Sequence, residues 1–275
     1  MLKSVLIKGL STAQNRSITL AFRDLASSYF VKDVKGLEAV EAEVSTTAYP
    51  DMDEDYLDGT RVGGRTIQIT LGLRPRRNMN ETVGSLRRGL NKIVPPKTPV
   101  RLTFTDDETP QMFVDGIVKG LAPTIFGKSS DIVLTVVSTS AYLTSTTQLK
   151  GLTFYTNDPY ALKYAGDAPA PFELYHKFVR PATAVRLRIN GASMLQLVYG
   201  FQTNDVLNIS TIPKQKFIYL TRGSTRTSLL DAINEGSLDV FFDAATDTVE
   251  FETSSLNKLE TEKFSVTYSA RYIGN

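Results

Sequence analysis

Hydrophobic and polar residues alternate along several short segments of the chain. Residues 65–71 read RTIQITL, with apolar side chains at alternate positions, and residues 100–104 (VRLTF) alternate in the same way. A period of two is typical of strands that bury one face. Residues 112–118 and 131–137 are rich in β-branched side chains, and the second run is apolar enough for a central strand. Short strands bounded by Gly, Asp and Pro predict an antiparallel β-sandwich or barrel.

The pattern predicts one helix in the first half of the chain. It places four apolar side chains on one stripe: Val83, Leu86, Leu90 and Ile93. Asn78 with Glu81 resembles the capping pair at a helix start, and the prolines at 95–96 end the helix. Gly84 and Gly89 each cost about 1 kcal/mol relative to Ala. We therefore expect the helix to be held by packing against a sheet.

The composition changes after Tyr142, where residues 143–148 read LTSTTQ without any periodicity. We place a domain boundary in this polar stretch, which gives domains 1–145 and 146–275. The second half is nearly all predicted strand, except for a short helical turn at 229–233. The strands expected there are 183–189, 195–199, 206–209, 217–220, 249–252 and 264–268.

The amino-acid composition excludes several classes of ligand and site. The 275 residues carry 31 Lys and Arg against 29 Asp and Glu, and a net charge of +2 provides no global field for nucleic acid or anionic lipid. The absence of Cys excludes disulfides and thiolate metal sites, and the absence of Trp removes the best side chain for stacking on sugars. Lys8 interrupts the apolar N-terminus, and no apolar stretch approaches the ~18 residues of a membrane span. We expect a soluble protein without cofactor or metal.

An acidic stretch, DMDEDYLDG at residues 51–59, suggests either a calcium site or an exposed loop. Its carboxylates include Asp51, Asp53, Glu54 and Asp55. The first three aspartates match the opening ligand positions of an EF-hand loop, but Tyr56 replaces the required glycine and Val62 replaces the bidentate Glu. A solvated loop, or a loop that contacts a neighbouring subunit, is therefore preferred over a calcium site.

A basic cluster follows the predicted strand at 65–71. It consists of Arg74, Arg76, Arg77, Arg87 and Arg88. Residues 73–93 contain no aromatic side chain, which disfavours a nucleic-acid or phosphate site, and isolated surface charges contribute little on their own. We hypothesise that this basic cluster meets the acidic stretch of an adjacent copy and sets the register of a ring.

Catalytic motifs are absent from the sequence. There is no GxSxG elbow, P-loop or dinucleotide-binding fingerprint, and the carboxylates form no recognisable catalytic pair. The single histidine, His176, fits a strand or interface residue better than a base. Tyr160, Tyr164 and Tyr175 form a candidate docking or glycan surface, although such residues more often fill a core or seal an interface. We expect a protein that is not an enzyme.

The order and spacing of short motifs over the whole chain resemble a known family. In the first half these are VKGL at 34–37, DG at 58–59, RTIQI at 65–69, VDGIV at 114–118, IFGKS at 125–129 and IVLTV at 132–136. In the second half they are YAGD at 164–167, NDVLNIST at 204–211, KFIYLTRG at 216–223 and YSARYIG at 268–274. The chain thereby resembles the distal tail protein (Dit) family of long-tailed, siphovirus-type bacteriophages. It departs from the family at 138–142, where a Cys-x-Asp-Pro-Tyr-like end is frequent, and at 237–240, where a Trp is common.

This resemblance implies a mainly β fold: an N-terminal β-sandwich with one packed α-helix, and a C-terminal galectin-like β-sandwich. It implies a homohexameric ring at the distal end of the tail in the virion, assembled in the host cytoplasm. The ring would join the tail tube protein to the tail-associated hub protein and could dock receptor-binding or side-fibre proteins. Without Trp, the C-terminal domain is interpreted as a docking or spacing module. The alternative is a glycan-binding virion module acting through that domain. A cell-wall hydrolase is the third and weakest interpretation.

Overall fold

The structure is a computed structural model that describes residues 2–10, 16–22, 24, 26–48, 55–123, 130–254 and 261–274. The chain divides into two units. Unit 1 consists of Met1–Thr146 and Tyr272–Asn275, and unit 2 consists of Thr147–Arg271. The end of the chain thus returns to unit 1, whereas the sequence interpretation assigned it to the second domain.

The described part of unit 1 is built of antiparallel strands, one α-helix and a short 3-10 turn at Arg77–Met79. Its elements are β1 (Leu2–Gly9), β2 (Ser17–Ala21), β3 (Tyr29–Lys35), β4 (Ala42–Ala48), β5 (Asp55–Val62), β6 (Thr66–Leu73), α1 (Val83–Ile93), β7 (Pro99–Asp106), β8 (Met112–Pro123), β9 (Ile132–Val137) and the first residues of β10 (Leu143–Tyr155).

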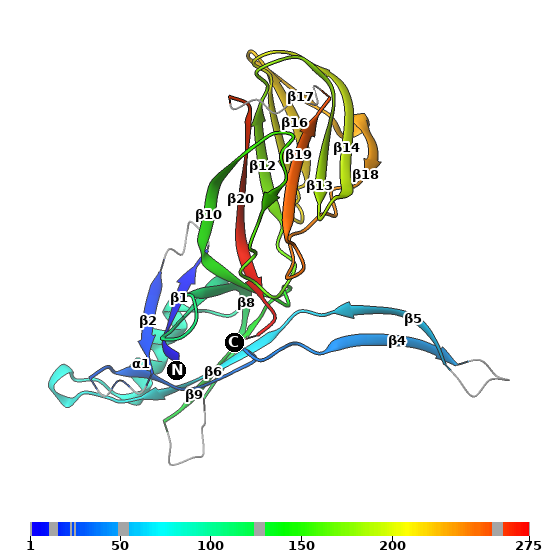
Figure 1. The fold of residues 1–275 in the computed structure, drawn as a ribbon. Coiled ribbons are helices and arrows are strands. Elements are labelled where there is room, and N and C mark those ends of the chain that lie inside the picture. Colours follow the sequence, from blue (N-terminus) through cyan, green and yellow to red (C-terminus); the bar gives the residue numbers. More distant parts are fainter. Residues whose placement is uncertain are drawn as a thin grey trace. The chain divides into compact units, whose positions relative to one another are not determined.

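Strand β8 connects two layers of unit 1 (Figure 1). Its first half pairs with β7, and the layer continues through β1 to β2. Its second half pairs with β9, and that layer continues through β6 to β3. The register shifts between Val118 and Gly120, where a bulge bends the strand from one layer into the other. The mainly β fold expected from the sequence is therefore confirmed.

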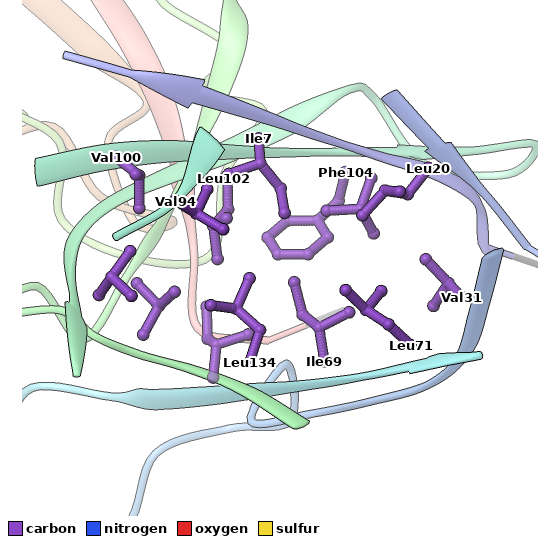
Figure 2. Packing of buried hydrophobic residues seen from close by; sticks show 14 of the residues in the cluster. Ile7, Leu20, Val31, Ile69, Leu71, Val94, Val100, Leu102, Phe104 and Leu134 are labelled. Carbon is purple, nitrogen blue, oxygen red and sulfur yellow. The ribbon is translucent and has the colours of Figure 1, made fainter. Parts of the chain in front are cut away.

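The alternating strands supply the core between these layers. Figure 2 shows Ile7 and Phe104 of one layer facing Ile69, Leu71 and Leu134 of the other. All five side chains are buried. Full burial of each such side chain stabilises the fold by about 1.5–3 kcal/mol. The alternation at residues 65–71 thus reflects the buried face of β6.

The helix α1 lies where the apolar stripe predicts it, but its capping residue differs. Leu86 and Leu90 are buried against the core. The cap is Thr82, which accepts a 3.1 Å hydrogen bond from the Ser85 amide and donates its own amide to the Ser85 hydroxyl at 2.9 Å. The predicted pairing of Asn78 with a residue three positions later is wrong, because Asn78 lies in the preceding 3-10 turn.

Unit 2 consists of two antiparallel sheets. Its elements are β10, β11 (Tyr160–Ala161), β12 (Phe172–Lys177), β13 (Ala182–Ile189), β14 (Ala192–Phe201), β15 (Val206–Ser210), β16 (Phe217–Arg222), β17 (Thr225–Ser228), a 3-10 turn (Leu230–Ala232), β18 (Ile233–Gly236), β19 (Thr248–Thr253) and β20 (Lys263–Tyr272). The first sheet has the order β17-β16-β15-β12-β20-β10, and the second has the order β11-β19-β13-β14-β18.

Aromatic side chains fill the space between the two sheets of unit 2. Phe251 of the second sheet lies 5.6 Å, between ring centroids, from Phe264 of the first. Phe172 and Phe242 stack at 4.3 Å. The six strands predicted for this half are all present. The polar stretch at 143–148 is a correction, because it forms the start of β10 rather than an irregular linker.

Candidate functional site

The hairpin β4–β5 is the most exposed element of unit 1. The two strands form a sheet of their own (Figure 1). Every residue in them is exposed. The exposed side chains include Val44, Tyr56 and Leu57, and Leu57 retains 56% of its accessible surface. A two-stranded hairpin that buries nothing is marginally stable in water. Apolar residues on such an element indicate a surface that a partner covers.

Of the acidic residues of the candidate ring contact, the structure describes Asp55. Asp55 begins β5 and is exposed. Asp51, Asp53 and Glu54 lie outside the described residues. Residues 55–59, expected as part of a loop, are strand instead. Within the ranges that the structure describes, no group of three or more His, Asp or Glu residues could hold a metal ion.

The basic residues of that contact lie around the turn between β6 and α1. Arg74 follows β6, with its guanidinium 5.6 Å from the centroid of the Phe30 ring. The turn is fixed by Glu81, which accepts hydrogen bonds from the Ser28 hydroxyl at 2.7 Å and the Arg76 amide at 3.0 Å. These two bonds hold the pKa of Glu81 below its usual value. Arg77 is exposed in the same turn.

Arg87 and Arg88 occupy successive positions on α1, so they point in directions about 100° apart. Arg88 is exposed, whereas Arg87 is half-buried. These two side chains therefore do not share one face of the helix.

The acidic and basic groups lie at opposite ends of one extended run of chain. Strand β5 leads from Asp55 through Gly63 and Gly64 directly into β6, which ends next to Arg74. At about 3.3 Å per residue, this run spans up to roughly 60 Å. Figure 1 shows β5 and the turn that follows β6 extending to opposite sides of unit 1.

Arg65, between β5 and β6, is a buried cation that binds backbone carbonyls. Its Nε donates to the carbonyl of Ala141 at 2.8 Å, and its Nη1 donates to the carbonyl of Gly36 at 3.2 Å. Its Nη2 donates to Ala141 and to Ile273. Only 3% of the residue is exposed, and this burial lowers the pKa of the guanidinium. Arg65 is thus structural and offers no charge to a ligand.

The predicted surface role of Tyr164 is wrong, because this side chain is buried in unit 2. Its hydroxyl donates to the Ala168 carbonyl at 2.6 Å and accepts from the Arg271 amide at 2.9 Å. Gly166 lies so close that a Cβ there would overlap this hydroxyl and the Arg271 carbonyl. The motif YAGD therefore encodes a backbone clamp rather than a ligand site.

Tyr160 and Tyr175 are exposed, at 47% and 45%, but they belong to different sheets. Tyr160 lies on β11, with its ring centroid 4.1 Å from that of Phe154. Tyr175 lies on β12, on the outer face of the first sheet. It lines a shallow depression with side chains of the neighbouring strands. The structure therefore does not combine the two tyrosines into one surface.

His176 points into the core of unit 2 and is fully buried. Its Nδ1 lies 3.1 Å from the carbonyl oxygen of Lys263, so Nδ1 carries the hydrogen that it donates. Its Nε2 lies 3.6 Å from Oε1 of Glu262, whose Oε2 accepts from Arg180 at 3.0 Å. Burial raises the pKa of Glu262, but the contacts with His176 and Arg180 outweigh burial and lower it. A histidine enclosed in this way has no access to a substrate.

The motifs NDVLNIST and KFIYLTRG meet in an ion pair between a buried carboxylate, Asp205, and a partly exposed guanidinium, Arg222. Asp205 accepts from Arg222 at 2.9 and 2.7 Å and from the Gln202 amide at 2.8 Å. The bond with Arg222 contributes most to holding the pKa of Asp205 below its usual value.

None of the described helices is long and apolar enough to cross a membrane.

The exposed hairpin and the two antiparallel β units define the class: a two-unit, mainly β protein. No family model and no curated protein matches the sequence. Among solved structures, the chain is similar to the Dit protein of phage SPP1, with a TM-score of 0.66, 13% identity and coverage of 97% of this chain and 98% of that one. That protein is described as a paradigm of the hub adsorption apparatus in phages that infect Gram-positive bacteria.

The chain also matches two structures of the phage P2 baseplate in its activated conformation. The structure with calcium gives a TM-score of 0.47 at 11% identity, and the structure with strontium gives 0.48 at 10%. They cover 97% and 98% of this chain and 98% of each matched chain. The similarity to the SPP1 protein, which extends over both units, confirms the fold expected from the resemblance to distal tail proteins.

Proposed function

We propose that this protein is a structural, non-enzymatic component of a bacteriophage tail tip. In this proposal six copies form a ring at the distal end of the tail, between the tail tube protein and the hub protein. The observation that carries the proposal is the exposed hairpin β4–β5, on a chain that shares its fold with the SPP1 Dit protein over nearly its full length. The hairpin supplies the surface that a neighbouring copy would cover.

The opposite positions of the acidic and basic groups support a head-to-tail contact. A contact between two different patches of identical subunits is heterologous, and it closes into a ring when the rotation between copies is appropriate. The hairpin tip with Asp55 would lie against the turn with Arg76 and Arg77 of the next copy. A net charge of +2 allows identical copies to approach without strong repulsion.

Light scattering with negative-stain imaging of the purified chain tests the proposal. We expect a particle of six times the 30.4 kDa chain mass, with a central hole. Leu57→Asp should reduce the mass to that of smaller species, because it places a charge within the covered surface. Leu230→Asp is the matched control, since Leu230 is similarly exposed, at 46%, but lies in unit 2. A monomeric wild-type chain, or a ring unaffected by Leu57→Asp, would contradict the proposal.

A second candidate function is binding of a glycan, or docking of a receptor-binding or side-fibre protein, through unit 2. It is supported by the exposure of Tyr175 beside a depression on the outer face of the first sheet. Binding through unit 2 is compatible with ring formation by unit 1.

A further inference from the structure

The outer face of the first sheet of unit 2 carries a shallow depression of about 140 Å³. The side chains that line it come from four adjacent strands: Glu173, Tyr175, Asn208, Phe217, Ser265 and Thr267. A strand period of two explains why they share one face, because the intervening residues on β12, Leu174 and His176, are buried.

The register of the sheet produces the hollow. Tyr175 lies opposite Asn208 on one neighbouring strand and opposite Ser265 on the other. Ser210, which has a short side chain, is the cross-strand partner of both Glu173 and Phe217. The two aromatic rings thus stand at either side of a row of small polar residues.

The polar groups around this hollow are available for a ligand. Across the ranges that the structure describes, the Glu173 carboxylate, the Tyr175 hydroxyl and the Asn208 amide make no hydrogen bond or ion pair within the protein. Together they offer a charged acceptor, a hydroxyl that both donates and accepts, and an amide that does the same.

We infer that this depression is a binding subsite for a neutral saccharide ring, an inference that rests on the glycan-binding candidate above. A pyranose ring presents an apolar C–H face, which stacks on an aromatic side chain, and an edge of hydroxyls, which needs mixed donors and acceptors. Tyr175 and Phe217 provide the stacking surfaces, and Glu173 and Asn208 bind hydroxyls.

The charge of the depression selects the class of saccharide. Glu173 is the only charged residue among those that line the depression. The cation beside it, Arg226, stacks on the Tyr219 ring at 3.7 Å and lies 5.7 Å from the Phe217 ring centroid. A negative charge repels phosphate and carboxylate groups, so neutral sugars bind in preference to anionic ones. The volume is below the roughly 300–1,000 Å³ of sites for drug-sized ligands, so one ring unit is held, with weak affinity. Several copies in one particle would raise the apparent affinity through multivalency.

A glycan array carrying neutral and anionic bacterial saccharides, probed with the full chain, tests the inference. We expect binding to neutral saccharides, reduced about tenfold by Tyr175→Ala and by Glu173→Gln. Tyr160→Ala is the matched control, because Tyr160 is equally exposed on the other sheet, and it should leave binding unchanged. Circular dichroism of each variant verifies the fold.

Three results would overturn the inference: no saccharide bound, binding to anionic saccharides alone, or equal effects of Tyr175→Ala and Tyr160→Ala. Light scattering on the same samples measures the oligomeric state, so failure of the saccharide subsite is distinguished from failure of the proposed ring. A ring that binds no saccharide refutes only the subsite. A monomer that binds through Tyr175 refutes only the ring.

Discussion

Arg65 donates a 2.6 Å hydrogen bond from Nη2 to the carbonyl oxygen of Ile273, a residue 208 positions further along the chain. The same guanidinium binds the carbonyls of Ala141 and Gly36. One buried side chain therefore holds three distant segments of unit 1 together, including the segment that returns from unit 2. The Glu38 carboxylate favours its charge, and the carbonyl oxygens accept from it together because the guanidinium is planar and has several donors.

We expect Arg65→Lys to destabilise unit 1 by about 3 kcal/mol, because a lysine cannot replace several hydrogen bonds from a charged group to buried carbonyls. The midpoint of urea unfolding, followed by circular dichroism, measures the change. Arg61→Lys makes the same substitution on the exposed hairpin and should have little effect. Equal urea midpoints for the two variants would contradict a stabilising role of the Arg65 hydrogen bonds.

The lowered pKa of Glu262 predicts a dependence of stability on pH. A carboxyl group whose pKa in the folded state lies below its unfolded value, near 4.5, stabilises the fold above that pH. This stability is lost as the pH falls through the folded pKa. Thermal unfolding between pH 3 and 7 should therefore show a steeper acid-side loss in the wild type than in Glu262→Gln.

Glu250→Gln provides a control of opposite sign for this pH series. Burial, followed by repulsion from Glu252, raises the pKa of Glu250, so ionisation of Glu250 costs stability as the pH rises. Because Glu250→Gln removes this cost, the free energy of unfolding should rise more between acid and neutral pH in this variant than in the wild type. Identical pH profiles for both variants and the wild type would exclude these roles.

Gly166→Ala should destabilise unit 2 by about 1–3 kcal/mol, because the added methyl group overlaps the Tyr164 hydroxyl and the Arg271 carbonyl. Gly200→Ala is the matched variant on β14, where nothing lies within 4 Å of the new Cβ. Differential scanning calorimetry should show a lower melting temperature for the first variant only.

Thr82→Ala should destabilise α1 by about 1 kcal/mol through loss of the hydrogen bond to the Ser85 amide. Asn78→Ala distinguishes this cap from the one that the sequence suggested, and it should leave the urea midpoint within experimental error. A larger effect of Asn78→Ala would restore the earlier assignment.

Charge reversal of Arg76 and Arg77 to Glu should dissociate the proposed ring at low salt, because both residues would face the acidic hairpin tip of the next copy. Analytical ultracentrifugation measures the distribution of species. The double variant Lys163→Glu/Lys177→Glu makes the same change in charge on exposed residues of unit 2 and should preserve the ring. Rings that survive both changes would show that the contact lies elsewhere.

Sequence patterns predicted the strands that bury one face. Ile67, Ile69 and Leu71 of β6 are fully buried, and their spacing alone indicates the strand. The hairpin β4–β5 escaped prediction because both of its faces are exposed, so no alternation marks it. The start of β10 was interpreted as a linker because its Ser and Thr residues form a strand through pairing with β8, which no local pattern records.

Site residues were harder to predict than strands. The burial of Tyr164 is not evident from the local sequence, because its partner, the Arg271 amide, lies 107 positions away. The exposed position of Tyr175 follows from the period of β12, between buried Leu174 and His176. The contributions of Asn208 and Phe217 depend on strand order, which a single sequence does not specify.

The order of β10 and β20 in the first sheet has an evolutionary consequence. The chain enters unit 2 on β10 and leaves it on β20, and these two strands are hydrogen-bonded neighbours. Unit 2 is therefore an insertion whose ends lie side by side, which is the arrangement that tolerates replacement of a whole domain. Both strands cross the boundary between the units, so an exchanged segment would have to keep residues 143–146 of β10, which pair with β8 in unit 1.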